Sequence, residues 1–336
     1  MRGYEVRGRD GIDSLHLIEM PEPDAGPGQV VVEMQAASLN FRDHGILRGG
    51  YLRNDRNPVV PLSDGTGVVV AVGEGVDRFK PGDRVVASFV QDWIDGPAND
   101  AVLRSSLGGG VDGVLVERRA FAEHALVPIS DELTPVEASC FPCAGVTAWQ
   151  ALFEHRELTG SDTVLLLGTG GVSIFALQLA TSVGATVIQT SSSDEKLDQA
   201  SQLGARHLVN YRTNPKWDEE VRSLTGGRGV DFVVEVGGPG TLAKSMAATA
   251  VGGQIALIGV LDDPAGAVHP LPAMFNLQAI QGIYVGSRRM LEKTLTHFEK
   301  RRLRPIVDRT FPFDQAADAY RYLRSQQHVG KVVIEF

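Results

Sequence analysis

The sequence predicts a two-domain α/β protein, in which a β-rich region precedes a doubly wound parallel sheet. Strand-like segments separated by turns fill the chain up to about residue 130. From about Thr134, short apolar runs with the length of buried strands alternate with helical segments, which is the pattern of βαβ units. A glycine-rich turn at residues 168–173 joins one of these runs to an apolar helix. These observations separate a β-rich part of the chain from an α/β part.

The β-rich part consists of valine-rich strands separated by turns. Residues 30–34 and 67–72 have the composition of strands, and residues 120–127 resume a strand pattern. A polar, glycine-rich loop at 91–113 precedes that last strand and contains no cysteine. Turn signals such as Pro81-Gly82-Asp83 separate the strands.

The α/β part alternates between strands and helices. The expected strands are 163–167, 185–190, 207–210, 230–235 and 253–259, and the expected helices include 134–139, 174–183 and 194–203. Strands that alternate with helices pair in parallel, because each helix carries the chain back across the sheet. Residues 331–336 form one more strand after the alternation has ended, and we expect this strand to return to the first domain.

The glycine turn, residues 168–173, predicts a nucleotide site. Its sequence is Gly168-Thr169-Gly170-Gly171-Val172-Ser173, a G-x-G-x-x-S pattern after a buried strand and before a helix. In this context the backbone N–H groups and the helix dipole can stabilise a pyrophosphate. Ser173 replaces the third glycine of the usual pattern and keeps that position small for helix–strand packing. The residues expected to bind the dinucleotide here are Gly168, Gly170, Gly171 and Val172.

The end of the next strand favours NADP(H) over NAD(H). In NAD sites of this type a carboxylate there accepts a hydrogen bond from the ribose 2′-OH. Here the strand ends in Ser191-Ser192-Ser193, whose hydroxyls can donate to a 2′-phosphate, and Lys196 follows within one helical turn. A structural explanation exists for the same residues, because Ser192 and Glu195 have capping-box spacing and Lys196 fits a solvated surface. NAD(H) is the alternative cofactor.

Composition and charge exclude several classes of protein. The chain has 336 residues, 43% of them hydrophobic and 22% charged, as in a globular protein long enough for two domains. The net charge of −9 argues against a nucleic-acid partner. No apolar run approaches the ~20 residues that span a bilayer, and the N-terminus has no signal-peptide core, so we expect a cytoplasmic protein without membrane contact. Cys140 and Cys143 cannot form a disulfide framework.

Several segments of the chain form an ordered set: residues 40–43, 61–67, 76–85, 143–149, the glycine turn and 328–333. Together they resemble blocks of the medium-chain dehydrogenase/reductase superfamily, in particular its zinc-independent quinone oxidoreductase branch. The resemblance implies a GroES-like catalytic domain over residues 1–130, completed by 305–336, and a Rossmann NADP-binding domain over 131–304. It also implies an active site in the cleft between the domains, and a homodimer paired near the strand 281–285.

The resemblance marks further cofactor residues. Lys196 and Tyr211 match positions that bind the 2′-phosphate in NADPH-dependent quinone reductases, although Tyr211 also fits as the end of a surface strand. Thr147 matches a position near the nicotinamide. Gly259-Val260 and Val285-Gly286 match backbone segments that line the nicotinamide pocket.

The zinc-dependent relatives are the main alternative within this resemblance. A catalytic zinc needs three protein ligands, usually thiolates and imidazoles. The positions of one thiolate and of the imidazole hold Asn40 and Ser63, whereas Cys143 and Asp64 match the remaining thiolate and the carboxylate. His44 is nearby but stands alone, and the loop that carries the structural zinc in relatives matches 91–113. We therefore expect no zinc.

Without a metal, the expected chemistry is hydride transfer between NADPH and an electron-poor small molecule, such as a quinone or an α,β-unsaturated carbonyl. Hydrogen-bond donors suffice to hold the developing oxyanion of such acceptors. The candidates are Asn40, Arg42 and Tyr51, with Asp43 ordering the loop or relaying a proton. Each also has a structural explanation, since Asn40 fits a turn and Asp43 fits an ion pair with Arg42. The alternatives are an alcohol dehydrogenase acting on a small alcohol or aldehyde, and a non-catalytic NADPH-binding sensor.

Overall fold

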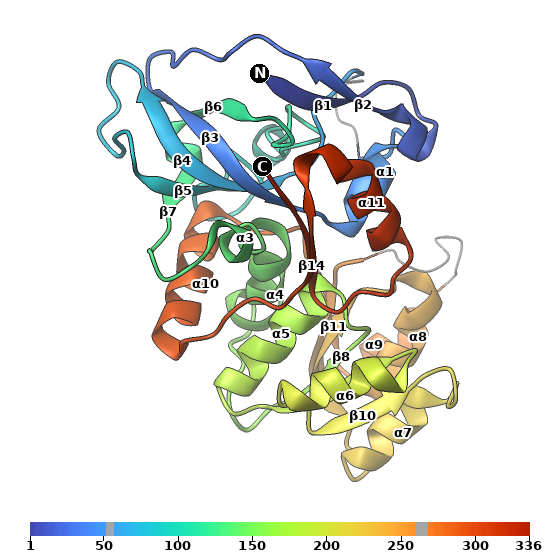
Figure 1. Cartoon of the computed structure of the whole chain (residues 1–336). Coiled ribbons are helices and arrows are strands. Elements are labelled where there is room, and N and C mark those ends of the chain that lie inside the picture. Colours follow the sequence, from blue (N-terminus) through green and yellow to red (C-terminus); the bar gives the residue numbers. More distant parts are fainter. Residues whose placement is uncertain (52–56, 260–267) are drawn as a thin grey trace. The chain divides into compact units, whose positions relative to one another are not determined.

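A computed structural model describes residues 1–51, 57–259 and 268–336. The chain forms two compact units (Figure 1). The first combines Met1–Val146 with Val285–Phe336, and the second is Thr147–Tyr284. These divisions differ from the boundaries at 130/131 and 304/305 that the sequence suggests. The difference arises because helix α10 (Arg288–Arg301) packs in the first unit, where the Phe298 ring lies 5.0 Å from that of Phe141.

The first unit is built on a seven-stranded sheet with the order β14-β15-β3-β4-β5-β7, in which β6 also pairs with β3. The strands are β3 (Gln29–Ser38), β4 (Asp64–Val72), β5 (Arg84–Ala87), β6 (Arg118–Ala122), β7 (Leu126–Pro128), β14 (Val307–Pro312) and β15 (Lys331–Glu335), beside a hairpin of β1 (Arg2–Val6) and β2 (Leu15–Glu19). Strand β15 pairs antiparallel with β3, so that Ile334 lies opposite Ala37. The final strand therefore completes the sheet of the first segment of the chain.

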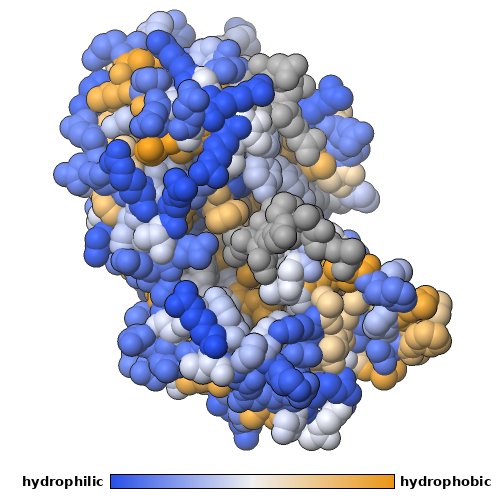
Figure 2. Space-filling view, turned by 90° about the vertical axis from the view of Figure 1, so that its right-hand side faces the viewer, coloured by the Kyte–Doolittle hydropathy of each residue, from blue (hydrophilic) through white to orange (hydrophobic). Residues whose placement is uncertain are grey.

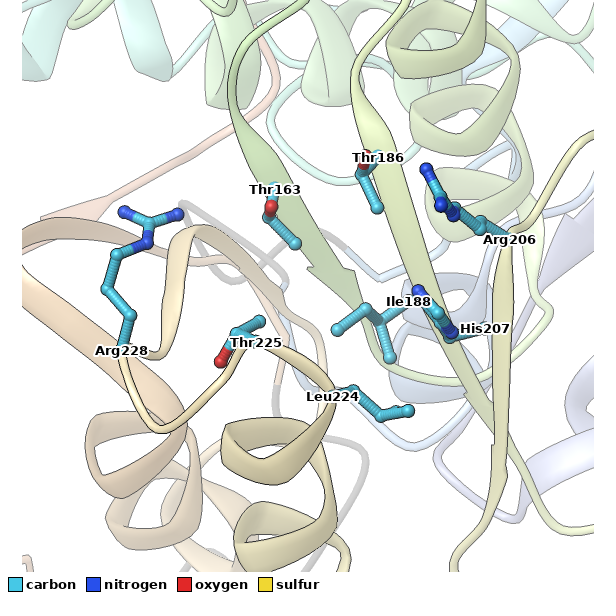
Figure 3. A pocket seen from close by; sticks show the side chains of 8 residues that line it. All are labelled: Thr163, Thr186, Ile188, Arg206, His207, Leu224, Thr225 and Arg228. Atoms are coloured by element: carbon cyan, nitrogen blue, oxygen red, sulfur yellow. The ribbon is translucent and has the colours of Figure 1, made fainter.

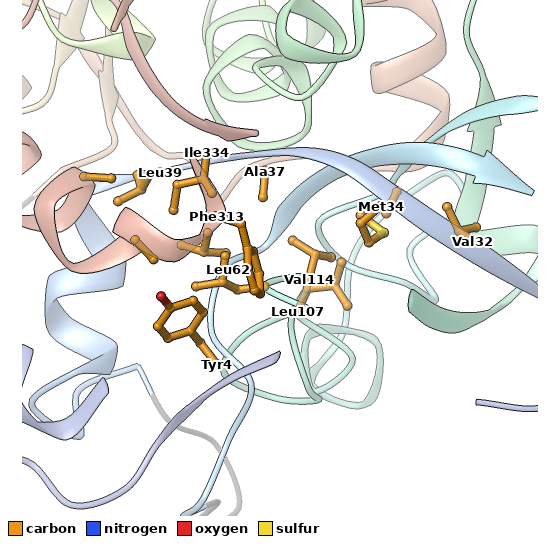
Figure 4. Packing of buried hydrophobic residues seen from close by; sticks show 14 of the residues in the cluster. Tyr4, Val32, Met34, Ala37, Leu39, Leu62, Leu107, Val114, Phe313 and Ile334 are labelled. Atoms are coloured by element: carbon orange, nitrogen blue, oxygen red, sulfur yellow. The ribbon is translucent and has the colours of Figure 1, made fainter. Parts of the chain in front are cut away.

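The core of the first unit draws on both ends of the chain. Figure 4 shows Tyr4, Leu39, Phe313 and Ile334 packed in one cluster of buried side chains. The rings of Tyr4 and Phe313 meet edge to face at 5.2 Å. Besides α10, the helices are α1 (Phe41–Ile46), α2 (Asp100–Leu103), α3 (Pro135–Ala138) and α11 (Ala316–Arg324).

The second unit is a six-stranded parallel sheet with the order β10-β9-β8-β11-β12-β13, which confirms the predicted doubly wound α/β fold. Its strands are β8 (Thr163–Leu166), β9 (Thr186–Ser191), β10 (His207–Asn210), β11 (Val230–Glu235), β12 (Thr249–Leu257) and β13 (Ala279–Gly282). Its helices are α5 (Gly171–Ser182), α6 (Asp194–Gln202), α7 (Trp217–Leu224), α8 (Pro239–Ala248) and α9 (Leu271–Phe275), and α4 (Val146–Trp149) begins at the unit boundary. The order reverses between β8 and β11, and ligands of such sheets bind at the carboxyl ends beside that reversal.

Within the described residues, no helix combines the length and the apolar composition that crossing a membrane requires.

Candidate functional site

The glycine turn lies at the carboxyl end of β8 and leads into α5. Gly168 has a φ of 68°, in the left-handed region that glycine tolerates best. Gly170 is the N-cap of α5, and no side chain caps this helix. A Cβ atom added at Gly168 or Gly170 would meet no other atom within 4 Å, so there is open space beside the uncapped N–H groups. The turn therefore fits a pyrophosphate.

Neighbouring side chains hold the glycine turn in place. Gln189 Nε2 donates to Gly168 O at 2.5 Å and to Leu166 O at 3.2 Å. Ser173 Oγ donates to Leu167 O at 2.6 Å, which ties the first turn of α5 to the end of the strand. Ser173 thus contributes a hydrogen bond in addition to the small size expected from the sequence.

The predicted 2′-phosphate residues gather at the carboxyl ends of β9 and β10. Ser191 pairs in register with Asn210, and Tyr211 N donates to Ser191 O at 3.1 Å. The Tyr211 side chain is 41% exposed. Ser192 and Ser193 are half-buried, and Lys196 follows on the first turn of α6, also half-buried. The fold thus brings these predicted residues to one edge of the sheet.

The start of α6 differs from the sequence interpretation. The N-cap is Ser193 rather than Ser192, and the Ser193 hydroxyl donates to the Glu195 carboxylate, so the capping box of Ser192 and Glu195 is wrong. Asp194 also stands close to this edge, where its Oδ1 accepts from Asn210 Nδ2 at 2.7 Å. Asp194 lies three residues beyond the last residue of β9, so it falls outside the strand end at which an acid is expected in NAD sites.

The residues predicted to lie near the nicotinamide are distributed over both units. Thr147 is buried in the second unit, in a helical stretch with π-helical turns at 141–145 and 150–154. Gly259 N donates to Glu235 O at 3.3 Å, and a Cβ there would lie 2.1 Å from Val236 O. Val260 lies outside the described residues. In the first unit, Val285 and Gly286 are buried.

Val285 has an unusual backbone conformation. Its φ is 58°, which is costly for a β-branched residue. Such strain persists only where the surroundings fix the backbone, and it is frequent at ligand sites.

A buried carboxylate that the sequence reasoning missed organises the end of β11. Glu235 Oε1 accepts from Gly237 N at 2.8 Å, Gly238 N at 3.0 Å and Thr241 Oγ1 at 2.6 Å, and Oε2 accepts from Ser245 Oγ. The loop that follows β11 is therefore fixed by one side chain. The sequence does contain a signal for this role of Glu235: a carboxylate ends an apolar strand two residues before a Gly-Gly pair.

A polar cavity of about 280 Å³ also lies in the second unit, at the opposite edge of the sheet (Figure 3). Three of the residues that line this cavity are the first residues of β8, β9 and β10, namely Thr163, Thr186 and His207. It therefore faces the amino ends of the strands, away from the glycine turn, and is not the predicted nucleotide site.

The first unit contains a buried polar cluster formed by Asn40, Asp43, Asp64 and Lys331. Lys331 Nζ donates to Asn40 Oδ1 and to Leu39 O, both at 2.6 Å, and lies 3.9 Å from Asp64 Oδ2. Asn40 N donates to Asp43 Oδ2 at 2.7 Å at the start of α1. Lys331 is not among the residues predicted from the sequence, although a lysine in an apolar strand indicates a buried charge that needs a partner.

The two carboxylates of this cluster are perturbed by their burial. Burial raises the pKa of Asp43 to about 6, against the lowering effect of Arg42, whose Nη1 lies 3.9 Å from Asp43 Oδ1. Burial also raises the pKa of Asp64, while Lys331 lowers it. Asp64 accepts from Ser63 Oγ at 2.7 Å and from Cys143 N at 3.0 Å.

The other predicted donors differ in their surroundings. Asn40 is buried, and so is its Nδ2, which interacts with the Asp64 carboxylate but has no partner at standard hydrogen-bond geometry among the described residues. The Arg42 guanidinium lies over the rings of Phe89 at 4.7 Å and Tyr51 at 5.9 Å, and its Nη1 donates to Leu107 O at 3.0 Å. Tyr51 is 44% exposed. Of the three predicted catalytic residues, Asn40 and Asp43 share one hydrogen-bonded cluster, and Tyr51 contacts it through Arg42.

The residues at the matching positions do not fit a catalytic zinc. Asn40 and Ser63 offer a neutral amide and a hydroxyl where a catalytic zinc would need a thiolate and an imidazole. Ser63 donates to Asp64, and the Lys331 ammonium pairs with the same carboxylate. Burial lowers the pKa of His44 to about 4, and its ring packs edge to face on Tyr320 at 5.8 Å. The described parts of the chain hold no group of three metal-ligating side chains.

Comparison with known proteins places these sites in context. A model of the alcohol dehydrogenase GroES-like domain matches residues 26–135, and a zinc-binding dehydrogenase model matches 171–300. The chain is 43% identical to the zinc-type alcohol dehydrogenase-like protein C1773.06c of Schizosaccharomyces pombe, over 97% of this chain and 96% of that protein. It is 29% identical to the acryloyl-coenzyme A reductase of Metallosphaera sedula, over 99% and 96%.

Solved structures show the same architecture. A putative alcohol dehydrogenase from Sinorhizobium meliloti 1021 matches with a TM-score of 0.91 and 41% identity over the whole of both chains. An NAD-dependent alcohol dehydrogenase matches at 0.90 and 34% over both whole chains. The crotonyl-CoA carboxylase/reductase AntE in complex with NADP matches at 0.87 and 25%, over 100% of this chain and 94% of that one. With the open glycine turn, these neighbours support a nicotinamide cofactor.

Proposed function

This chain belongs to the medium-chain dehydrogenase/reductase superfamily, as its sequence resemblance predicts, and we propose that this oxidoreductase is a zinc-independent, NADPH-dependent reductase of quinones or α,β-unsaturated carbonyls. The observation that carries the proposal is the amide of Asn40, which matches a zinc-ligand position and whose buried Nδ2 has, apart from its interaction with the Asp64 carboxylate, no hydrogen-bond partner among the described residues.

The chemistry of the acceptor follows from the donor set. NADPH, when bound at the glycine turn, supplies a hydride to an electron-poor carbon, and a proton from water completes the reduction. The electron pair of the acceptor double bond moves to its oxygen. Asn40 Nδ2–H donates to that oxygen as its negative charge develops. An unactivated ketone needs a stronger electrophile, such as a metal ion, so conjugated acceptors suit an amide donor better.

The test of this role is Asn40→Ala, assayed with NADPH on a panel of quinones and enones. We expect kcat/KM to fall about 10²-fold or more, as for the loss of an oxyanion donor, while the Kd for NADPH changes less than about twofold. Undiminished turnover by Asn40→Ala would remove Asn40 from the mechanism.

NADPH is the proposed cofactor because donors gather where a 2′-phosphate would lie. These donors lie at the carboxyl ends of β9 and β10 or within one turn beyond; they are Ser191, Ser192, Ser193, Lys196 and Tyr211. Asp194 stands at the same edge, but its carboxylate is held by Asn210. We expect tighter binding of NADPH than of NADH in a fluorescence titration, and the opposite order would overturn this choice.

Two alternatives are separated by one assay. The relatives named alcohol dehydrogenases favour a panel that also includes aldehydes, assayed with NADPH, and small alcohols, assayed with NADP⁺. Turnover is followed as the fall or the rise of NADPH absorbance. Reduction of quinones or enones alone supports the proposal, and turnover of alcohols alone supports the dehydrogenase alternative. NADPH binding without turnover of any panel member would support a sensor.

We also propose that two copies pair through the second unit. Strand β13 is an edge strand that pairs only with β12 among the described residues. Apolar side chains are exposed around it, including Phe275 and Leu277, each 75% exposed, and Figure 2 shows hydrophobic surface in the lower part of the view. Sedimentation should show a dimer, and Phe275→Asp should weaken it. A monomeric wild-type protein at micromolar concentration would contradict this pairing.

A further inference from the structure

We propose that Lys331 is a positioning residue that fixes the orientation of the Asn40 amide and so leaves Nδ2 as the donor to substrate. This inference rests on the proposed function, because it assigns a cause to the donor that the reaction uses. It concerns a residue from the last strand of the chain, β15, which also pairs with β3.

The chemistry of the ammonium group determines which way the amide faces. A lysine ammonium has three N–H donors and no acceptor, so only the carbonyl end of an amide can face it. Lys331 Nζ lies 2.6 Å from Asn40 Oδ1 and 2.6 Å from Leu39 O. The amide with its nitrogen toward Nζ would set two donors against each other. The Nδ2 atom must therefore point away from Lys331.

The ammonium is itself held in place. Lys331 is 2% exposed, and the fully buried Asp64 carboxylate lies 3.9 Å from Nζ. Asn40 N is fixed by Asp43 Oδ2 at 2.7 Å, so both the backbone and the side-chain oxygen of Asn40 are anchored. The Asn40 side chain also interacts with the Asp64 carboxylate through a hydrogen bond, which helps to lower the pKa of Asp64 and uses one of the two Nδ2 hydrogens. The second Nδ2 hydrogen has no partner among the described residues, and because Nδ2 is itself buried, a substrate oxygen has to displace its surroundings to reach it.

The positive charge also strengthens this donor. A hydrogen bond from an ammonium to the amide oxygen withdraws electron density from the amide, so the Nδ2–H bonds become more polar. The buried Lys331 ammonium thus acts on the substrate through the Asn40 side chain, which stands where related enzymes have a metal ligand. Lys331 does not need to contact the substrate.

The test removes the Lys331 ammonium without leaving the Asp64 carboxylate buried and unpaired. Lys331→Met alone would bury Asp64 without its partner and risks unfolding. The informative variant is therefore Lys331→Met in an Asp64→Asn background, compared with Asp64→Asn alone. We expect kcat for the best acceptor to fall about tenfold or more, with the NADPH Kd and the melting temperature close to the reference.

A double-mutant cycle asks whether Lys331 acts through Asn40. In an Asn40→Ala, Asp64→Asn background, Lys331→Met should lower kcat less than about twofold further, because the group that it positions is gone. Lys331→Arg keeps a cationic donor and should retain more activity than Lys331→Met. The exposed Lys216→Met, with a side chain 73% exposed, is the matched control and should leave kcat unchanged.

The failures of the two proposals differ. If no acceptor is reduced by the wild type, or if Asn40→Ala is fully active, the proposed function or its donor fails. If Asn40→Ala is impaired but the Lys331 variant matches its Asp64→Asn reference, the positioning role of Lys331 is wrong. Additive losses from Lys331→Met and Asn40→Ala also contradict it, because they would show that Lys331 acts independently of Asn40.

Discussion

The glycine turn and the buried polar cluster differ in how far apart their components lie along the chain. The turn is one continuous segment between β8 and α5, and its donors are backbone N–H groups. The cluster joins side chains from distant segments, and Lys331 lies 291 residues beyond Asn40. A nucleotide site of backbone donors is encoded locally, whereas a site of side-chain donors depends on the tertiary fold.

The two sites also differ in their electrostatics. The turn offers partial charges on N–H groups beside open space, with little cost of desolvation. The cluster buries the full charge of Lys331 beside Asp43 and Asp64, which is tolerated only because each group has partners. The first site is therefore robust to its surroundings, and the second is sensitive to any change in its charges.

The strongest test of the local character of the nucleotide site is Ser192→Asp. A carboxylate there repels a 2′-phosphate and accepts from a ribose 2′-OH, so the ratio of NADPH to NADH affinity should fall about 100-fold. Ser201→Asp, at an exposed position of helix α6, which follows Ser192, should leave the ratio unchanged. Fluorescence titration with both nucleotides measures it. If Ser192→Asp leaves the ratio of NADPH to NADH affinity unaltered, the ribose 2′ group does not bind near the end of β9.

A smaller effect is expected from Gly168→Ala. Gly168 and Gly226 have φ values of 68° and 62°, and an added Cβ meets no atom within 4 Å at either position. Alanine therefore costs both positions a similar, modest stability, on the order of 1 kcal/mol. Only Gly168→Ala should raise the Kd for NADPH, by about tenfold, because its methyl group enters the space beside the turn. Equal Kd values for the two variants would contradict the predicted pyrophosphate site.

The charge sensitivity of the cluster predicts a pH-dependent stability for Asp43. Its folded-state pKa of about 6 lies above the ordinary value of 3.8, so Asp43 stabilises the fold below pH 3.8 and loses that contribution as the pH rises through 6. Between pH 5 and 7 the wild type should lose about 1 kcal/mol relative to Asp43→Asn. Urea unfolding of both proteins at the two pH values measures this difference. A constant difference would show that Asp43 keeps one protonation state over this range.

The smallest expected effect is that of a metal chelator. Because the Lys331 ammonium pairs with Asp64, and Asn40 and Ser63 are not zinc ligands, prolonged dialysis against a strong chelator should leave kcat unchanged within error. Elemental analysis of tag-free protein is the companion measurement. Loss of activity that added zinc restores would mean that the cluster rearranges around a metal.

The sequence predicts much of the fold and the local parts of the sites. The glycine turn, the parallel sheet and the serine segment all follow from neighbouring residues, and the structure places Ser191 beside Tyr211 as strand pairing requires. Lys331 and Glu235 were missed, because each sits in an apolar strand and its role depends on partners that only folding supplies. The N-cap at Ser193 was missed by one residue, because adjacent serines offer the same capping chemistry.

The position of β15 has a consequence for the order of synthesis. The ribosome completes every residue of the second unit before it reaches Lys331, so the newly made second unit, with the proposed dinucleotide site, can fold while the first unit still lacks its last strand. During that interval Asp64 and Asn40 have no ammonium between them. Nascent chains are thus expected to gain the capacity to hold a dinucleotide before they gain the capacity to reduce anything.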